Sequence, residues 1–99
     1  MRIVKTVEEF NEIINSNDKV LVDFFATWCG PCRMLAPNLE DLAEEDSTPI
    51  IKVDVDEVGE LARKFGIFSI PTLIVFKNGK ETKRELGYKT LDELKELIK

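Results

Sequence analysis

The two cysteines of this chain, Cys29 and Cys32, are the residues best suited to chemistry. Gly30 and Pro31 separate them, and Trp28, the only tryptophan, comes just before. A disulfide between them would close so short a loop that it would restrain the unfolded chain very little. The same spacing suits a reversible two-electron switch, because either sulfur can reach the other without a backbone rearrangement. The pair therefore predicts thiol–disulfide exchange.

Two other uses of such a cysteine pair stay open from spacing alone. Zinc sites also begin with Cys-x-x-Cys, but tetrahedral zinc needs further cysteine or histidine ligands. The chain has no histidine and no third cysteine, so we expect no metal site within one chain, although two chains could share one. Two inert, buried cysteines are the second alternative. The turn-forming pair Gly30-Pro31 between the thiols argues against it.

The surroundings of the two cysteines predict different roles for them. If a strand ends at Ala26 and a helix begins at Cys29, the Cys29 sulfur meets unsatisfied N–H groups and the positive end of the helix dipole. Both favour the thiolate, so we expect the pKa of Cys29 to be lowered and Cys29 to be the nucleophile. Cys32, one turn further along, is expected to be more covered and to act as the resolving thiol. Pro31 suits an early helical position, and Trp28 either packs or presents a binding surface.

Asp23 interrupts an otherwise apolar run that should form a buried strand. An isolated buried carboxylate is costly, so we expect its pKa to be raised. A carboxyl of this kind near two sulfurs is a candidate general acid and base for the resolving thiol. A half-exposed Asp23 or a structural salt bridge are the alternatives. Lys52, in the middle of a neighbouring run, is its candidate charge partner, or it extends to solvent.

Five segments predict strands. The three mostly apolar runs, 19–26, 50–55 and 72–77, lack alternation and should be buried on both faces. Asn78-Gly79 is a strong hairpin signal, and the charged, alternating run 80–86 after it predicts an edge strand. The short apolar patch 3–4 predicts a second edge.

Four further segments, three between strands and one after the last strand, predict helices. Capping boxes at 6–9 and 90–93 should open the first and the last. A long helix from Cys29 to about Asp46 contains Pro37, which should kink it. Asp56 is expected to cap a short helix that ends at Gly66. The apolar stripes of these helices are Phe10, Ile13 and Ile14; Leu35, Leu39, Leu42 and Ala43; Val58, Leu61, Ala62 and Phe65; and Leu91, Leu94, Leu97 and Ile98.

This order, βαβαβα followed by ββα, predicts an α/β fold with a parallel portion, an antiparallel edge and helices on both sheet faces. Ninety-nine residues are expected to form one domain, residues 1–99. A hydrophobic content of 43% and a charged content of 33% indicate a soluble globular protein. A net charge of −5 argues against general nucleic-acid binding. We expect no signal peptide, no membrane span and a cytoplasmic location, where paired cysteines are more often catalytic than structural.

These residues together resemble the thioredoxin family over essentially the whole chain. The matching stretches are 22–32, which ends in Trp28-Cys29-Gly30-Pro31-Cys32, then Met34, Ala36-Pro37, 52–56, Gly66-Ile67, 70–72, 76–79 and Gly87. The resemblance implies a thioredoxin fold, a five-stranded mixed sheet with four helices in three layers. It places Asp23 behind the cysteines with Lys52 near it, makes the Ile70–Pro71 bond cis, and makes Pro37 the helix kink. It also implies a substrate groove across Trp28, Gly30, Pro31, Ser69, Ile70, Pro71 and Gly87.

The function implied by the resemblance is reduction of protein disulfides. Cys29 attacks the target, Cys32 resolves the mixed disulfide with help from Asp23, and a thioredoxin reductase resets the pair. We expect a monomer that needs no cofactor or metal and serves electron transport and cell redox homeostasis. A disulfide oxidase or isomerase, or a redox-dependent binding module, are the alternatives on the same fold. Phe25, where many family members have tryptophan, and Phe68-Ser69 depart from the family, and the latter pair bears on partner preference.

Overall fold

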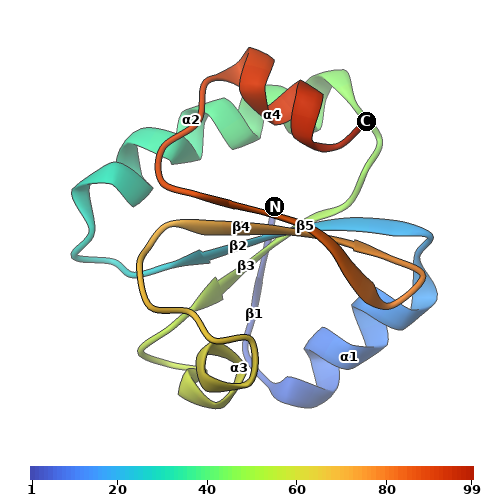
Figure 1. Cartoon of the computed structure of the whole chain (residues 1–99), viewed down its shortest axis with the longest axis vertical. Helices are drawn as coiled ribbons and strands as arrows, with labels where there is room; N and C mark the ends of the chain where they lie inside the picture. The colour runs from blue at the N-terminus through green and yellow to red at the C-terminus, as the bar shows by residue number, and fades with distance from the viewer.

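The computed structural model describes residues 1–99 and arranges them in three layers around a five-stranded sheet (Figure 1). The strands are β1 (Arg2–Val4), β2 (Lys19–Phe25), β3 (Ile50–Asp54), β4 (Thr72–Lys77) and β5 (Lys80–Leu86), in the spatial order β1-β3-β2-β4-β5. β3 pairs in parallel with both β1 and β2, whereas β4 pairs antiparallel with β2 and β5. The predicted mixed sheet with one parallel portion and an antiparallel edge is therefore confirmed.

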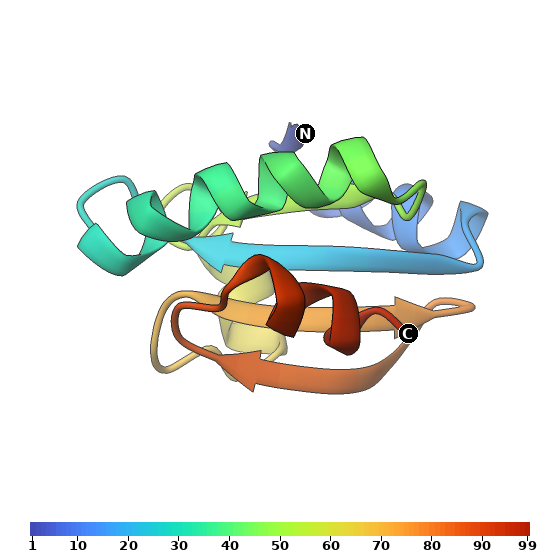
Figure 2. The ribbon, with the colours of Figure 1, turned by 90° about the horizontal axis from the view of Figure 1, so that it is seen from above.

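The four helices are α1 (Val7–Ser16), α2 (Gly30–Glu45), α3 (Gly59–Lys64) and α4 (Leu91–Leu97). α2 and α4 cover one face of the sheet, and α1 and α3 cover the other (Figure 1). Seen from above, α2 runs along β2, with α4 beside it (Figure 2). None of these helices has the length and apolar character needed to cross a bilayer.

The alternation of side chains along β2 builds a separate apolar core on each face, as strand geometry requires. Val20, Val22 and Phe24 face α1 and α3. Leu21 faces α2 and α4, and Asp23 and Phe25 follow it on that face. Asp23 therefore lies on the sheet face that α2 and α4 cover, because its strand position alternates with Val22 and Phe24.

The helix starts differ in detail from the predicted caps. The box at Thr90 is complete, because Thr90 and Glu93 exchange both hydrogen bonds. At α1, Thr6 Oγ1 accepts the Glu9 N–H at 3.0 Å, but the Glu9 carboxylate accepts from the Lys5 N–H, one residue earlier than predicted. Arg2 also pairs with this carboxylate, which explains why Glu9 turns away from Thr6.

The start of α3 corrects a second prediction. Asp56 does not cap this helix; Val58 occupies the N-cap without a side-chain hydrogen bond. Asp54 Oδ1 instead accepts the Asp56 and Glu57 N–H groups in the preceding turn. The end of the helix is as predicted: Gly66 has φ +63°, and the N–H of the next residue reaches back to the helix end in a Schellman arrangement.

The long helix α2 begins at Gly30, one residue after the predicted start, and continues through Pro37 as one element. Its buried stripe consists of Leu35, Leu39 and Leu42, as predicted. Ala43 is exposed, which corrects the fourth member of the predicted stripe. A small side chain next to a leucine stripe tolerates both burial and exposure, so the sequence pattern could not determine whether Ala43 is buried.

The β4–β5 hairpin turns at Asn78 and Gly79, both with positive φ as the sequence predicts. Gly79 has φ +81°, and a Cβ there would collide with the Asn15 side-chain oxygen. We therefore expect Gly79→Ala to lower the free energy of unfolding by about 1–2 kcal/mol, because alanine disfavours this backbone region. Urea denaturation followed by circular dichroism measures the change.

Gly59→Ala is the matched control for that substitution. Gly59 lies at the start of α3, and an added Cβ would contact only the flexible end of Arg63 at 3.1 Å. Its free energy of unfolding should stay within about 0.5 kcal/mol of the parent or rise. Equal losses in the two variants would contradict the role assigned to the hairpin turn.

Candidate active site

The two cysteines lie where strand β2 ends and helix α2 begins. They form a disulfide, with their Cα atoms 5.2 Å apart. Cys29 is the N-cap of α2, and its Sγ accepts the Cys32 N–H at 3.2 Å. The Cys29 N–H bonds to the Ala26 carbonyl, so a tight turn carries the chain from strand to helix. The predicted position of one sulfur at a helix N-terminus is confirmed.

Burial does not separate the two cysteines as predicted. Cys29 is 4% exposed and Cys32 is 3% exposed, so Cys32 is not measurably the more covered residue. The cysteines belong to a small buried cluster with Phe25 and Ala26, and Ile70 and Val55, from loops distant in sequence, pack against that cluster. Spacing along a helix cannot reveal such remote cover.

Two further loops meet the disulfide. The Ile70 carbonyl oxygen lies 3.9 Å from Cys29 Sγ, and the Ile70–Pro71 bond is cis, as the resemblance implies. Thr72 Oγ1 donates to the Ser69 carbonyl at 2.6 Å, and the Gly87 N–H donates to the Pro71 carbonyl at 2.8 Å. Ile70, Pro71 and Gly87 are thus connected to one another and to Cys29.

The other residues of the predicted groove are partly or fully exposed. Trp28 is 67% exposed, Gly30 is half-buried at the first position of α2, and Pro31 and Ser69 are exposed. The sequence-predicted groove residues therefore come from loops that the structure brings to one end of the sheet.

Trp28 has a partner that the sequence did not reveal. Its indole N–H donates to Asp56 Oδ2 at 2.8 Å, so Trp28 is both tethered and exposed. Asp54 in turn accepts the Asp56 N–H and holds that loop. The acidic pair after β3 is visible in the sequence, but which carboxylate caps the turn and which takes the indole depends on the fold.

Asp23 is fully buried, with 0% exposure, and neither carboxylate oxygen has a hydrogen-bond partner. Burial raises its pKa from an ordinary value near 3.8 to about 6, and the charge of Lys52 partly opposes this. Lys52 Nζ lies 3.9 Å from Asp23 Oδ2 and 4.5 Å from the centre of the Phe25 ring. A half-exposed Asp23 is excluded, and Lys52 is its only ion-pair partner.

A hollow of about 240 Å³ lies beside the cysteines, and Lys52, but not Asp23, is among the residues that line it. Its lining includes Lys52, Phe25, Cys32 and Arg33. Arg33 Nη1 donates to the Thr27 carbonyl at 3.0 Å and so braces the turn before the cysteines. Lys52 and Cys32 therefore border the same hollow, whose lining is mostly apolar.

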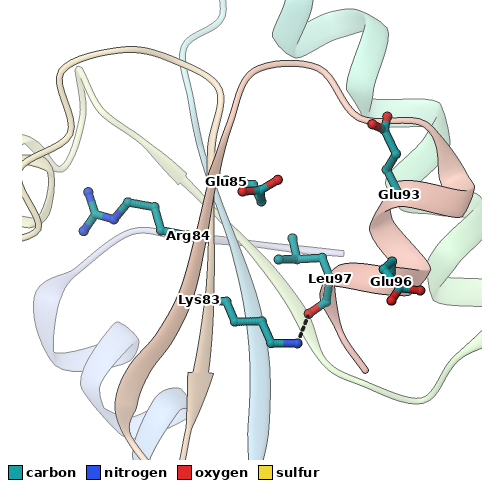
Figure 3. A pocket seen from close by; sticks show the side chains of 6 residues that line it. All are labelled: Lys83, Arg84, Glu85, Glu93, Glu96 and Leu97. Carbon is teal, nitrogen blue, oxygen red and sulfur yellow. Dashed lines mark hydrogen bonds between the residues drawn. The ribbon is translucent and has the colours of Figure 1, made fainter.

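A larger groove of about 560 Å³ lies between β5 and α4, away from the cysteines (Figure 3). Its lining carries charges of both signs, and Lys83 Nζ donates a hydrogen bond to the Leu97 carbonyl at 3.2 Å. Arg84 points to the other side of the strand, where it bonds to the Phe65 carbonyl. We assign no chemistry to this groove.

Comparison with known proteins identifies the arrangement. The sequence pattern of the family described as thioredoxin matches residues 2–99. The chain belongs to the thioredoxin family. The thioredoxin of Bacillus subtilis (strain 168) is 46% identical over 100 residues, covering 99% of this chain and 96% of that protein. A solved structure of Plasmodium falciparum thioredoxin superimposes with a TM-score of 0.94 at 45% identity, covering 99% of this chain and 96% of that one.

The predicted thioredoxin fold is therefore confirmed, with its five-stranded mixed sheet and four helices. The chain is a thioredoxin-type protein-disulfide reductase whose active-site disulfide is Cys29–Cys32. One relative, from Mycobacterium leprae, is named a bifunctional thioredoxin reductase/thioredoxin. It is 50% identical over 82 residues, which are 81% of this chain and 18% of that protein.

Asp23 should make stability depend on pH. Its pKa is higher in the folded protein than in the unfolded chain, so between about pH 4 and 6 the folded state holds the extra proton. Its contribution to stability is therefore largest below that window and is lost as the pH rises through it. Relative to Asp23→Asn, the oxidised parent should lose about 2.5 kcal/mol of unfolding free energy between pH 4 and pH 8.

Urea unfolding of both oxidised proteins across this pH range measures the difference. Asp41→Asn, a substitution on the exposed side of α2, serves as the control and should follow the parent at every pH. Parallel curves for the parent and Asp23→Asn would show that Asp23 titrates normally.

Proposed function

We propose that Cys29 is the nucleophile and Cys32 the resolving thiol in the reduction of target-protein disulfides. The observation that carries this assignment is the position of Cys29 Sγ as the N-cap of α2, 3.2 Å from the Cys32 N–H. When the disulfide opens, this N–H and the helix dipole stabilise negative charge on Cys29. The Ile70 carbonyl, 3.9 Å away, marks where the target sulfur approaches.

The exchange then proceeds in two balanced steps. The Cys29 thiolate attacks one sulfur of the target disulfide, a mixed disulfide forms, and the other target sulfur leaves as a thiolate. Cys32 loses its proton and attacks Cys29 Sγ, which releases the second target thiolate and forms Cys29–Cys32. Two electrons pass from the protein dithiol to the target, and the two target thiolates take up one proton from solvent, where Cys29 lost its own, and one that Cys32 releases.

Asp23 accepts the Cys32 proton in this proposal. With a pKa of about 6, its carboxylate is mostly ionised at pH 7 and remains a usable base. Neither oxygen has a hydrogen-bond partner in the protein, so a proton that arrives on Asp23 breaks no existing hydrogen bond. Lys52 lines the hollow together with Cys32 and lies 3.9 Å from Asp23 Oδ2, so its charge stabilises the Asp23 carboxylate next to the hollow that Cys32 borders.

The target segment docks across the groove formed by the outer loops. Trp28 offers an exposed ring, and the backbone of Ile70 offers hydrogen bonds to an extended peptide. The Gly87–Pro71 bond keeps the two flanking loops together. The complete groove is Trp28, Gly30, Pro31, Ser69, Ile70, Pro71 and Gly87.

We further propose that residues 1–99 act as one domain and as a monomer in the cytoplasm. Its partners are disulfide-containing target proteins and a thioredoxin reductase. The fusion of both activities in the Mycobacterium leprae relative supports the reductase as electron donor. We choose the cytoplasm because it is a reducing compartment, where a dithiol can be returned to its reduced form continuously. The mechanism uses no metal, organic cofactor or nucleic acid.

Cysteine variants test the roles directly. We expect Cys29→Ser to abolish insulin-disulfide reduction with reductase or dithiothreitol as electron source. Cys32→Ser should instead accumulate a covalent mixed disulfide with the target through Cys29, because no resolving thiol follows. Non-reducing electrophoresis and mass spectrometry detect it. Adducts through position 32 in Cys29→Ser but none in Cys32→Ser would reverse the assignment, and a strongly oxidising potential would favour an oxidase.

Asp23→Asn tests the proton acceptor. We expect resolution of the mixed disulfide to slow by about a hundredfold at pH 7, because general base catalysis is lost. The first attack by Cys29 should change by less than about threefold, since Asp23 acts on the other thiol. Rapid acid quench with thiol alkylation separates the two steps. Asp41→Asn is the control, and an unchanged resolution rate would remove Asp23 from the mechanism.

A further inference from the structure

Phe68 is the most exposed large apolar residue of the protein. It lies in the loop between α3 and β4 and is 99% exposed. It joins none of the aromatic pairs, which connect Phe10, Phe24, Phe65 and Phe76. The fold therefore gains almost nothing from this ring. Because single exposed apolar side chains are ordinary, its location decides whether it has a use.

That location is beside the reacting sulfur. Phe68 stands two residues before Ile70, whose carbonyl oxygen lies 3.9 Å from Cys29 Sγ. Two residues of chain span at most about 7 Å. A target sulfur bonded to Cys29 would lie near Ile70, which brings the target residues next to it within reach of Phe68.

The loop that presents Phe68 is held at both ends. On one side, Gly66 closes the end of α3 and Arg84 Nη2 donates to the Phe65 carbonyl at 2.7 Å. On the other, Thr72 Oγ1 donates to the Ser69 carbonyl. A ring on such a braced loop loses little freedom when a partner covers it, which favours binding.

Two other large apolar side chains, close to the cysteines in sequence, are also exposed. Trp28 is 67% exposed and Met34, on the turn of α2 after Cys32, is 65% exposed. Trp28 and Phe68 are thus two exposed aromatic rings on the two segments next to Cys29, the one that contains it and the one whose Ile70 carbonyl lies near its sulfur. Exposed aromatic side chains of this kind are typical anchors of protein–protein contacts.

We propose that Phe68 determines target preference by contacting an apolar side chain about two to four residues from the target's reactive cysteine. The proposal rests on the function proposed above, because the target must first dock beside Ile70. The preferred partners are polypeptides with an aromatic or long aliphatic residue near their disulfide. Segments with acidic or small polar residues there bind less well.

A single-turnover experiment tests the proposal. The pre-reduced protein is mixed with disulfide-bonded peptides that differ at one position, which carries phenylalanine or serine and is moved along the sequence beside one cysteine. Trp28 is the only tryptophan, so its fluorescence reports oxidation of the adjacent pair. Hydroxyethyl disulfide, which has no flanking side chain, measures the exchange chemistry alone.

We expect the wild-type protein to oxidise about tenfold faster, at subsaturating peptide, when phenylalanine occupies the favoured position. Phe68→Ser should abolish this preference and leave the rate with hydroxyethyl disulfide unchanged. Phe68→Leu should retain most of it. Ile3→Ser, which alters an exposed apolar residue of the edge strand β1, should behave as wild type in both assays.

The outcomes separate this inference from the function on which it rests. If hydroxyethyl disulfide fails to oxidise the wild-type protein, the proposed exchange itself is wrong. If it reacts normally but Phe68→Ser keeps the peptide preference, the role of Phe68 is overturned. A sedimentation result in which wild type dimerises and Phe68→Ser does not would assign the ring to a second copy and also overturn it.

Discussion

The hydrogen bond from the Cys32 N–H to Cys29 Sγ is the interaction on which the active site depends. The first N–H groups of a helix lack partners within it, and serine, threonine, aspartate or asparagine usually supplies one. Here a sulfur takes that place at the start of α2. An N–H and a helix dipole bind an anion more strongly than a neutral sulfur. Opening the disulfide therefore leaves charge where the backbone is already oriented to receive it.

The central position of β2 keeps this geometry fixed. β2 is hydrogen-bonded to β3 on one side and β4 on the other, so the turn that follows it cannot move independently of the sheet. The same strand carries Asp23, opposite Lys52 in one register and Leu73 in the other. An apolar residue at this position would remove the cost of burying a carboxylate that has no hydrogen-bond partner. The chain thus keeps a destabilising carboxylate on the strand that leads to its cysteines. Such a group is typical of a functional site rather than of a core optimised for stability.

Long-range features of the fold could be predicted because their signals are redundant. β4 and β5 have the predicted bounds, since apolar content, charge and an Asn-Gly turn all indicate the same hairpin. Local side-chain choices were less predictable because competing partners come from remote segments. Glu9 bonds to Lys5 rather than Thr6, with Arg2 alongside, and Asp54 takes the turn that Asp56 could have capped.

The same limit applies to the active site. The cysteine pair, the buried acid and the order of the groove loops follow from residue types and family resemblance. The packing around the cysteines does not, because it includes Val55 and Ile70, which are remote in sequence and meet this cluster only in the folded sheet. The indole of Trp28 likewise finds its acceptor after β3, 28 residues further along the chain.

The distribution of exposed apolar residues indicates how the site meets its partners. Of seven large apolar residues that are exposed, four belong to α2 or to the loops that precede it, precede β4 and follow β5: Trp28, Met34, Phe68 and Tyr88. Hydrogen bonds fix several of their segments, including those from Asn38 to the Tyr88 hydroxyl and the Lys89 carbonyl. A surface that is apolar and already ordered can accept a target without paying a large ordering entropy. Recognition and chemistry therefore share one constraint: the loops at this end of the sheet must be held before the target arrives, because the Cys29 sulfur can react only where its capping geometry is intact.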